Sequence, residues 1–325
     1  MSFRLAEINN STKKSFSPLT RSASFTTNNI PQRRIIQDTF MKLLSYGLDY
    51  RMEPRLAFSL GGQAIDVMRA SLWMKEDRHA QDFLNLASSM KLALEDWQRS
   101  FSLLSQLEEA FKNIDTTGLS IHARPLAQAE DDIVFFAPIP DPPSIRFFNA
   151  FVDESPESFD FGQTQTLLGH GQELIPTGLS PRGEIATIIA ANKMGENPEI
   201  AGYTIVNNWT AAQEKASGKT GFALGQATSL GPYLVTSDQI KSLMIGKGLN
   251  MDMQISLNGH TEVDTRLKEM NFSFDDMIKY ARSTRVTAGD IFCSGSPSKR
   301  DLTLSLGQKI DIEIQALGML STVVA

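Results

Sequence analysis

The 325-residue sequence contains a single cysteine, Cys293, so an internal disulfide is excluded. A chain without disulfides suits a reducing compartment. Long apolar runs are missing as well, and none approaches the roughly 20 residues that a membrane-spanning helix needs. We therefore expect a cytoplasmic protein that has no membrane among its partners.

Positive charge is in deficit too, because 31 Lys and Arg residues face 37 Asp and Glu residues, which gives a net charge of −6. An acidic chain is repelled by phosphate backbones, so we expect no nucleic-acid partner. Only four histidines occur, and His79, His122, His170 and His260 lie too far apart to predict a zinc site. Apolar residues at 41% and charged residues at 21% are typical of a soluble globular protein.

Three patterns organise the first 130 residues. An amphipathic pattern predicts a short helix over Ile35–Leu48. Two apolar-alternating arms around Gly61-Gly62 predict a hairpin over Arg55–Met68. Apolar residues near a 3.5-residue spacing in Asp82–Phe111 predict one or two helices that pack on the rest of the domain. The same spacing leaves open a coiled coil that recruits a partner.

The pattern changes after Asp131–Pro143, which predicts a strand followed by a proline-rich crossing. We place a domain boundary there, between residues 1–130 and residues 131–325. Strands dominate the second part, and the expected ones are Glu184–Ala190, Ala201–Asn207, Tyr233–Thr236, Met253–Leu257, Ile291–Cys293 and Lys309–Leu317.

Two local signals complete this part of the chain. Asn258-Gly259 between apolar-alternating runs predicts a tight hairpin turn. Phe272–Thr284 predicts a helix with Ser273 as its N-cap and acidic residues close behind. The expected fold class is α+β and β-rich, with a small, partly helical N-terminal domain.

Five segments between Phe135 and the C-terminus carry recognisable motifs. They read APIPDPPSIRFFNAF (Ala137–Phe151), GHGQELIP (Gly169–Pro176), RGEIATIIA (Arg182–Ala190), IAGYTIVNNWTAAQEKASGKTGFALGQATSLGPYLV (Ile200–Val235) and NFSFDDMIKYARSTRVTAGDIFCSGSP (Asn271–Pro297). Together and in this order they resemble the fumarylacetoacetate hydrolase family. The resemblance implies a mixed β-roll domain and a homodimer. The end Leu317–Ala325 supports a homodimer, because it is too apolar to lie free in water.

The resemblance also implies a chemistry. Members of the family cleave, decarboxylate, isomerise or dehydrate small acids that contain a 1,3-dicarbonyl or 2-oxo acid group. A divalent metal, usually magnesium, chelates two substrate oxygens and stabilises the developing enolate. In the family an E-x-E pair and one or two aspartates hold the metal, a histidine acts as general base, and a lysine assists.

This sequence departs from that pattern at most of the reactive positions. In chain order, Phe147 replaces an aspartate, Glu154 the histidine, Arg182 the first glutamate, Asn208 the second aspartate and Leu224 the lysine. Glu184 alone remains of four carboxylates. One carboxylate beside an arginine and an amide cannot hold a hard cation well, because such cations prefer several anionic oxygens. We therefore expect no metal and no other cofactor.

Three interpretations of this altered site stay open. Arg182 can take over part of the task of the metal by pairing with a ligand carboxylate or enolate, over an apolar surface made by Phe147. The ligand is then a small or polyketide-like 2-oxo acid or β-dicarbonyl, and the reaction is C–C cleavage, decarboxylation, isomerisation or cyclisation. Alternatively, Arg182 and Glu184 neutralise one another in a catalytically silent protein with a binding, regulatory or partner-stabilising role. The third interpretation is an ordinary metal-dependent C–C hydrolase.

Further candidate residues follow from the same motifs. His170, in a glycine-rich loop near the expected site entrance, is a candidate for proton transfer. Cys293 is expected to be a small buried residue without a catalytic role. The remaining candidates for substrate binding are Trp209, Thr228, Ser229, Ser294 and Ser296.

The first 34 residues are rich in Ser, Thr and Asn, with Glu7 as their only acidic residue. Such a bias is typical of an organellar transit peptide. However, Phe3–Ile8 resembles the short first strand with which many family members begin. We therefore favour a solvated insertion over about residues 9–34 that follows this strand.

Overall fold

A computed structural model of the protein describes residues 40–174, 178–191, 196–211, 217–218 and 227–325. The chain divides into two compact units, residues 1–35 and 36–325, and only the second contains described residues. The expected strand Phe3–Ile8, the Ser/Thr-rich insertion and Leu224 lie outside the described residues. Among the helices that are described, none is long and apolar enough to cross a membrane.

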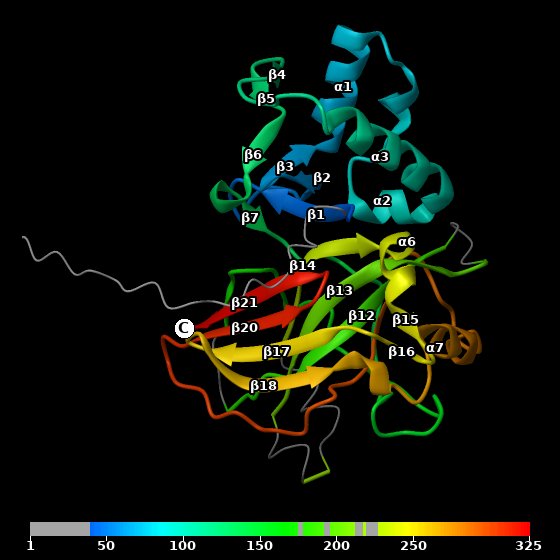
Figure 1. The fold of residues 1–325 in the computed structure, drawn as a ribbon, viewed down its shortest axis with the longest axis vertical. Helices are drawn as coiled ribbons and strands as arrows, with labels where there is room; N and C mark the ends of the chain where they lie inside the picture. Colours follow the sequence, from blue (N-terminus) through cyan, green and yellow to red (C-terminus); the bar gives the residue numbers. More distant parts are fainter. Residues whose placement is uncertain (1–39, 175–177, 192–195, 212–216, 219–226) are drawn as a thin grey trace, which may run out of the picture. The chain divides into compact units, whose positions relative to one another are not determined.

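A 12-stranded mixed sheet is the largest element of the described residues. Its main path runs β6-β3-β2-β1-β14-β13-β12-β19-β8-β9, as Figure 1 shows from β6 to β12, with β7 paired to β1 and β10 to β14. In chain order its strands are β1 (Lys42–Gly47), β2 (Arg55–Leu60), β3 (Gln63–Asp66), β6 (Ala127–Ala129), β7 (Val134–Phe135), β8 (Ile145–Phe147), β9 (Asp160–Phe161), β10 (Leu167–Leu168), β12 (Gly183–Ala190), β13 (Glu199–Trp209), β14 (Ala227–Thr236) and β19 (Ile291–Cys293).

A second sheet of five strands has the order β11-β21-β20-β17-β18 within the described part of the chain. Its strands are β11 (Glu173–Leu174), β17 (Asp252–Leu257), β18 (His260–Arg266), β20 (Lys309–Ile314) and β21 (Gly318–Val324). Short pairs are formed by β4 (Ser120–Ile121) with β5 (Arg124–Pro125), and by β15 (Met244–Ile245) with β16 (Gly248–Leu249). The described helices are α1 (Val67–Arg78), α2 (Met90–Glu95), α3 (Trp97–Phe111), α6 (Ser237–Ile240) and α7 (Phe274–Ala281), with short 3₁₀ turns at Asp82–Asn85, Glu130–Asp132, Lys241–Leu243 and Leu267–Glu269.

The β-rich α+β fold class is confirmed, and so are most of the predicted elements. The hairpin around Gly61-Gly62 is β2 and β3. Asn258 and Gly259 join β17 to β18 with φ angles of 50° and 79°, the left-handed conformation that a two-residue hairpin turn needs. Ser273 caps α7, because its side chain accepts from the Asp276 backbone N–H while the Asp276 carboxylate accepts from the Ser273 backbone N–H.

The predicted helix over Ile35–Leu48 is wrong where the structure describes it, because Lys42–Gly47 is strand β1. This strand pairs with β2, β7 and β14, and Leu43 and Leu44 are both fully buried although they point to opposite faces. A strand that is covered on both faces has no alternation of apolar and polar residues, so its apolar pattern resembles that of a helix.

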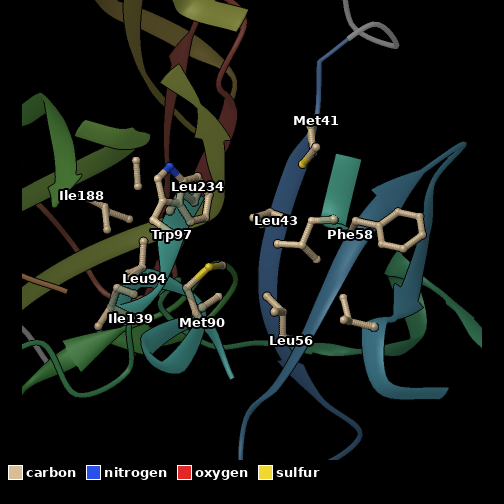
Figure 2. Packing of buried hydrophobic residues seen from close by; sticks show 14 of the residues in the cluster. Met41, Leu43, Leu56, Phe58, Met90, Leu94, Trp97, Ile139, Ile188 and Leu234 are labelled. Atoms are coloured by element: carbon tan, nitrogen blue, oxygen red, sulfur yellow. The ribbon is translucent and has the colours of Figure 1, made fainter. Parts of the chain in front are cut away.

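One hydrophobic core cluster joins the hairpin strands, helices α2 and α3, and the central strands of the large sheet. In the view of Figure 2, Met90, Leu94 and Trp97 of these helices lie between Leu43 of β1 and Ile188 of β12. The helices of Asp82–Phe111 thus pack on the protein itself, as predicted. The domain boundary expected after residue 130 falls in the 3₁₀ turn Glu130–Asp132 and stays a prediction.

The apolar C-terminal end does not lie free in water. Residues Gly318–Val324 form β21, which pairs with β20 and β11, and Leu320 and Val324 are buried. The argument that this segment requires a second subunit to cover it is therefore wrong. The homodimer stays a prediction that rests on the family resemblance.

Asp66 joins the hairpin to the first helix. It is the last residue of β3 and the N-cap of α1, and it is fully buried. Its carboxylate accepts from the Tyr46 hydroxyl at 2.7 Å, from Arg55 Nη2 at 2.9 Å and from the Arg69 backbone N–H at 2.8 Å. Burial opposes ionisation of Asp66, but the hydrogen bonds from Arg55, Arg69 and Tyr46 outweigh it and lower the pKa of this carboxyl.

Replacing Asp66→Asn should lower the free energy of unfolding by about 3 kcal/mol at pH 7, because it leaves Arg55 without its buried partner. A carboxyl with a lowered folded-state pKa stabilises the fold above its unfolded pKa and loses this effect as the pH falls toward the folded value. The difference between wild type and variant in urea unfolding should therefore shrink below about pH 4. Asp252→Asn, at an exposed ion pair with Arg266, is the control and should change stability by less than about 0.5 kcal/mol. A pH-independent difference would contradict the role of the carboxylate.

Candidate functional site

A cavity of about 480 Å³ lies where β8, β12 and β13 meet the loop that follows β19. Five of the residues predicted for the site line it together, namely Phe147, Arg182, Glu184, Asn208 and Ser296. The other described lining residues are Phe148, Asn149, Val152, Asp160, Thr210, Gly295, Ser298, Lys299 and Asp301.

Glu184 and Asn208 form the buried centre of this cavity wall. β12 and β13 pair antiparallel with Glu184 opposite Val206. Asn208 lies two residues after Val206 and on the same face of β13, so its side chain lies beside that of Glu184. Asn208 Nδ2 donates to Glu184 Oε1 at 3.0 Å, and the Gly295 backbone N–H donates to Glu184 Oε2 at 3.0 Å. Glu184 is 3% exposed and Asn208 is 4% exposed, so both contacts are shielded from water.

Gly295 is required at this position by its surroundings. Its φ angle is 78°, and a Cβ atom placed on it would lie 2.6 Å from the carbonyl oxygen of Phe148. A residue with a side chain would therefore be strained and would also displace the backbone N–H that binds Glu184.

The side-chain oxygen of Asn208 is buried and has no hydrogen-bond partner among the described residues. The orientation of the amide follows from its neighbour, because a carboxylate only accepts and so must face Nδ2 rather than Oδ1. A buried acceptor without a donor costs about 1–3 kcal/mol. Because Asn208 also lines the cavity, its Oδ1 is a candidate acceptor for a hydrogen-bond donor of a ligand.

Arg182 is held by the loop after β19. Its Nη1 donates to the carbonyl oxygens of Ser298 at 3.2 Å and Arg300 at 3.1 Å, and its Nη2 forms an ion pair with Asp301. The ion pair that the structure records for Arg182 is with Asp301, and not with Glu184, the partner predicted from the sequence. The sequence could not predict the contact, because Asp301 lies 119 positions away along the chain.

Phe147 supplies an apolar surface, as expected. It ends β8, which pairs with β19 through Cys293 and with β9 through Asp160. Phe147 is 5% exposed and lines the cavity together with Phe148 and Val152. Apolar side chains in the lining lower the local dielectric and strengthen polar contacts in the cavity.

Four of the predicted substrate-binding residues lie in the interior instead of in the described cavity lining. Trp209, Thr228, Ser229 and Ser294 are fully buried. Trp209 Nε1 donates to Ser229 Oγ at 2.8 Å, and Ser294 Oγ donates to the Gly295 carbonyl at 2.7 Å. Their contacts are those of residues that support the site. Cys293 is fully buried, as expected, and burial raises the pKa of its thiol.

His170 and Glu154 are not among the described residues that line this cavity. His170 lines a second cavity of about 490 Å³ with Lys42 and Tyr233, because its loop is drawn to β21 by the Gly171 N–H, which donates to the Ser321 carbonyl at 2.9 Å. The expectation that His170 lies at the site entrance is therefore wrong. Burial lowers the pKa of His170, so its imidazole is neutral at pH 7. Glu154 is exposed in the loop between β8 and β9.

Sequence reasoning missed several residues of the cavity wall. Asn149 and Val152 follow Phe147 closely, and Lys299 and Asp301 follow Ser296. The run SGSPSKRD, with polar residues directly after two candidate serines, is the signal that points to Ser298 and Lys299. Asp160 carried no such signal, because only the pairing of β9 with β8 brings it to the site.

The donor set does not fit a divalent oxygen-seeking metal. Such a cation requires several anionic oxygens. Of the four positions at which the family resemblance implies a carboxylate, Glu184 alone carries one. Both of its oxygens already accept hydrogen bonds from Asn208 and Gly295. Within the described residues no group of three His, Cys, Asp or Glu side chains could hold a metal ion.

Comparison with known proteins identifies the class to which this fold and site belong. The sequence model of the fumarylacetoacetate hydrolase C-terminal domain matches residues 149–325, which is more than half of the chain. The protein therefore belongs to the fumarylacetoacetate hydrolase family. A sequence comparison with curated proteins finds no significant match.

Solved structures of that fold resemble the chain over most of its length. Maleylpyruvate hydrolase from Sphingobium sp. SYK-6 superposes with a TM-score of 0.63 at 16% identity, covering 88% of this chain and 100% of its own. A 2-hydroxyhepta-2,4-diene-1,7-dioate isomerase from Mycobacterium marinum gives 0.58 at 17% identity, covering 88% and 98%. Fumarylacetoacetate hydrolase from the psychrophile Exiguobacterium antarcticum gives 0.58 at 17% identity, covering 87% and 99%. At these identities the likeness establishes the shared fold.

Proposed function

We propose that the cavity around Asn208 binds a small 2-oxo acid or 1,3-dicarbonyl acid, and that it does so without a divalent metal. The observation that carries this proposal is the buried Asn208 Oδ1, an acceptor without a partner among the described residues. It stands beside Glu184, at the position where the family resemblance implies a metal-binding aspartate.

The chemistry of Asn208 selects the form of the ligand. A carboxylate at this position would attract a cation, whereas a neutral amide oxygen accepts a hydrogen bond from an O–H group. The enol tautomer of a dicarbonyl compound carries such an O–H group. Asn208 therefore favours the neutral enol, while a metal ion would favour the enolate.

The dimensions and polarity of the cavity suit a small acid. Its volume of about 480 Å³ lies within the usual range of small-molecule sites. Its lining combines apolar side chains such as Phe147 and Val152 with polar ones such as Thr210 and Ser296. A ligand with one carboxylate, one enol and a short apolar portion matches this distribution.

Family membership supports the ligand class. The named relatives of similar structure are a maleylpyruvate hydrolase and isomerases of small unsaturated diacids. The maleylpyruvate hydrolase has also been solved with manganese and pyruvate, which shows a small 2-oxo acid in a protein of this fold. Of the reactions considered, enol–keto isomerisation requires least from this site. In the keto-to-enol direction, Glu184 would take the proton from the α-carbon and pass it to the carbonyl oxygen, and the enol O–H formed in this way would donate to Asn208.

A catalytically silent protein is the second candidate. The contacts of Arg182 favour it, because an arginine that binds Asp301 and two backbone carbonyls stabilises the fold whether or not a ligand is present. In this case the family fold persists for a binding or regulatory role.

The first test is a thermal-shift and calorimetry panel of oxaloacetate, acylpyruvates and other 2-oxo and β-keto acids. At least one compound should raise the melting temperature of the wild type. Asn208→Ala should weaken its binding about tenfold or more, because the enol loses a buried hydrogen bond. Asn250→Ala, at an exposed position outside the cavity, is the matched control and should bind normally. The absence of stabilisation by every compound would refute the proposed ligand class.

The same panel separates an enzyme from a binding protein. Ultraviolet spectroscopy follows the conversion of enol to keto oxaloacetate directly. A rate above the buffer reaction that Glu184→Gln abolishes supports isomerisation. Binding without acceleration supports the silent protein instead.

Metal independence is tested by restoring the carboxylates. Wild-type protein should bind manganese no more tightly than about millimolar in calorimetry, because the carboxylates that line the cavity form no group that could hold a metal ion within the described residues. The double variant Arg182→Glu, Asn208→Asp should bind it at least about tenfold more tightly, since three carboxylates then face one point. A micromolar site in the wild type that Glu184→Gln removes would overturn metal independence and favour a metal-dependent hydrolase.

A further inference from the structure

The guanidinium of Arg182 holds the backbone on both sides of one residue. Its Nη1 donates to the carbonyl oxygens of Ser298 and Arg300 at 3.2 Å and 3.1 Å, and Lys299 lies between these two residues. Two hydrogen bonds from one nitrogen to carbonyls two residues apart fix the course of the chain through Lys299. The ion pair of Nη2 with Asp301 extends this hold by one residue.

Arg182 is itself anchored to the central strands. Its backbone N–H donates to Asn207 Oδ1 at 2.9 Å, and its carbonyl accepts from the Asn208 N–H at 2.9 Å. Its side chain is 18% exposed, so water competes little for its hydrogen bonds. The arginine therefore connects the loop to β13, through its backbone contacts with Asn207 and Asn208 and its side-chain contacts with the loop.

The loop of residues 295–302 is also attached at its two ends. The Gly295 N–H donates to Glu184, and the Leu302 N–H donates to Ser180 Oγ at 3.0 Å. Between these points Arg300 Nη2 forms an ion pair with Glu262 at 2.6 Å. Loop residues that carry so many contacts hold one conformation, and this conformation places Ser296, Ser298 and Lys299 in the cavity wall.

The charges of the cavity wall identify Lys299 as the group that faces an anionic ligand. The charged lining residues are Asp160, Arg182, Glu184, Lys299 and Asp301. Arg182 is paired with Asp301. Among the described lining residues, Lys299 is the cation for which the structure records no ion pair, and it is exposed.

We propose that Lys299 binds the carboxylate of the ligand and that Arg182 is the positioning residue that holds it in place. The assignment rests on the proposed function, because it names the group that recognises the acid in the same cavity. It replaces the sequence-based interpretation in which Arg182 itself pairs with the ligand. A compact ammonium on a fixed backbone can reach a carboxylate at the mouth while Asn208 accepts from the enol deeper in the cavity.

The first arm of the test needs no ligand. Trypsin cleaves after Lys and Arg, so the rate of cleavage at Lys299 and Arg300 reports how often this loop opens. Arg182→Ala should raise that rate about tenfold or more, as expected from the loss of hydrogen bonds that close the loop. Arg266→Ala, which removes an exposed ion pair with Asp252, is the matched control and should leave cleavage at these two bonds unchanged.

A second variant guards against general unfolding. Asp301→Asn keeps the two carbonyl contacts of Arg182 and should give a smaller increase in cleavage than Arg182→Ala. Cleavage that rises equally at all sites of Arg182→Ala would show a general loss of stability and would overturn the local role of the arginine. Unchanged cleavage at Lys299 and Arg300 would overturn it as well.

The second arm is a double-mutant cycle on the affinity for the acid that gives the largest thermal shift, with oxaloacetate as the first probe. Lys299→Ala and Arg182→Ala should each weaken binding about tenfold. The double variant should be no more than about twofold weaker than either single variant, because Arg182 acts through Lys299. Lys247→Ala, at an exposed ion pair with Asp276, is the matched lysine control and should bind normally.

The outcomes separate this inference from the proposed function. Additive effects of the two substitutions would show that Arg182 contacts the ligand directly and would overturn its positioning role. Normal binding by Lys299→Ala would overturn the role of Lys299 while the proposed ligand class stands. If no acid stabilises the wild type, the proposed function and the role of Lys299 both fail, and the cleavage rates then show whether Arg182 holds the loop.

Discussion

The antiparallel pairing of β12 with β13 is the constraint on which the rest of the site depends. It fixes Arg182, Glu184 and Asn208 close together, and it does so with backbone hydrogen bonds that are independent of the side chains. The strands are buried along nearly their whole length, so their register cannot slip without moving apolar residues into water. Residues at these positions can therefore change chemically while their geometry stays the same.

That independence explains how a member of the fumarylacetoacetate hydrolase family can differ so much at its reactive positions. Glu184 remains, but its two oxygens accept hydrogen bonds from the Asn208 amide and from the Gly295 backbone N–H. The family resemblance implies instead that this carboxylate coordinates a cation together with other carboxylates. Arg182 stands where the resemblance implies a glutamate, and its side chain binds the loop after β19. The same frame thus holds these hydrogen bonds where the family resemblance implies a cluster of carboxylates.

The sequence predicted the parts of the fold that local signals determine. The turn at Asn258-Gly259 and the cap at Ser273 each depend on a few neighbouring residues, and both are correct. Strand β1 was mistaken for a helix because distant residues cover both of its faces. Leu43 belongs to the cluster with Met90, and Leu44 to the cluster with Phe135. For the site, the motifs placed five residues around one cavity. They could not place His170 or reveal the partners of Arg182, since both depend on long-range pairing with β21 and with the loop after β19.

Gly295 divides the site into a part that must stay constant and a part that is free to vary. Its left-handed backbone and its close approach to the Phe148 carbonyl tie it to the frame, and its N–H binds Glu184. Residues 296–301 leave the frame from this point and return to it at Leu302, which binds Ser180. A relative could exchange these six residues for others of similar span and acquire a different ligand preference without refolding. The ligand-binding role proposed for Lys299 thus lies on a short segment between two fixed points, whereas Glu184 belongs to the sheet itself.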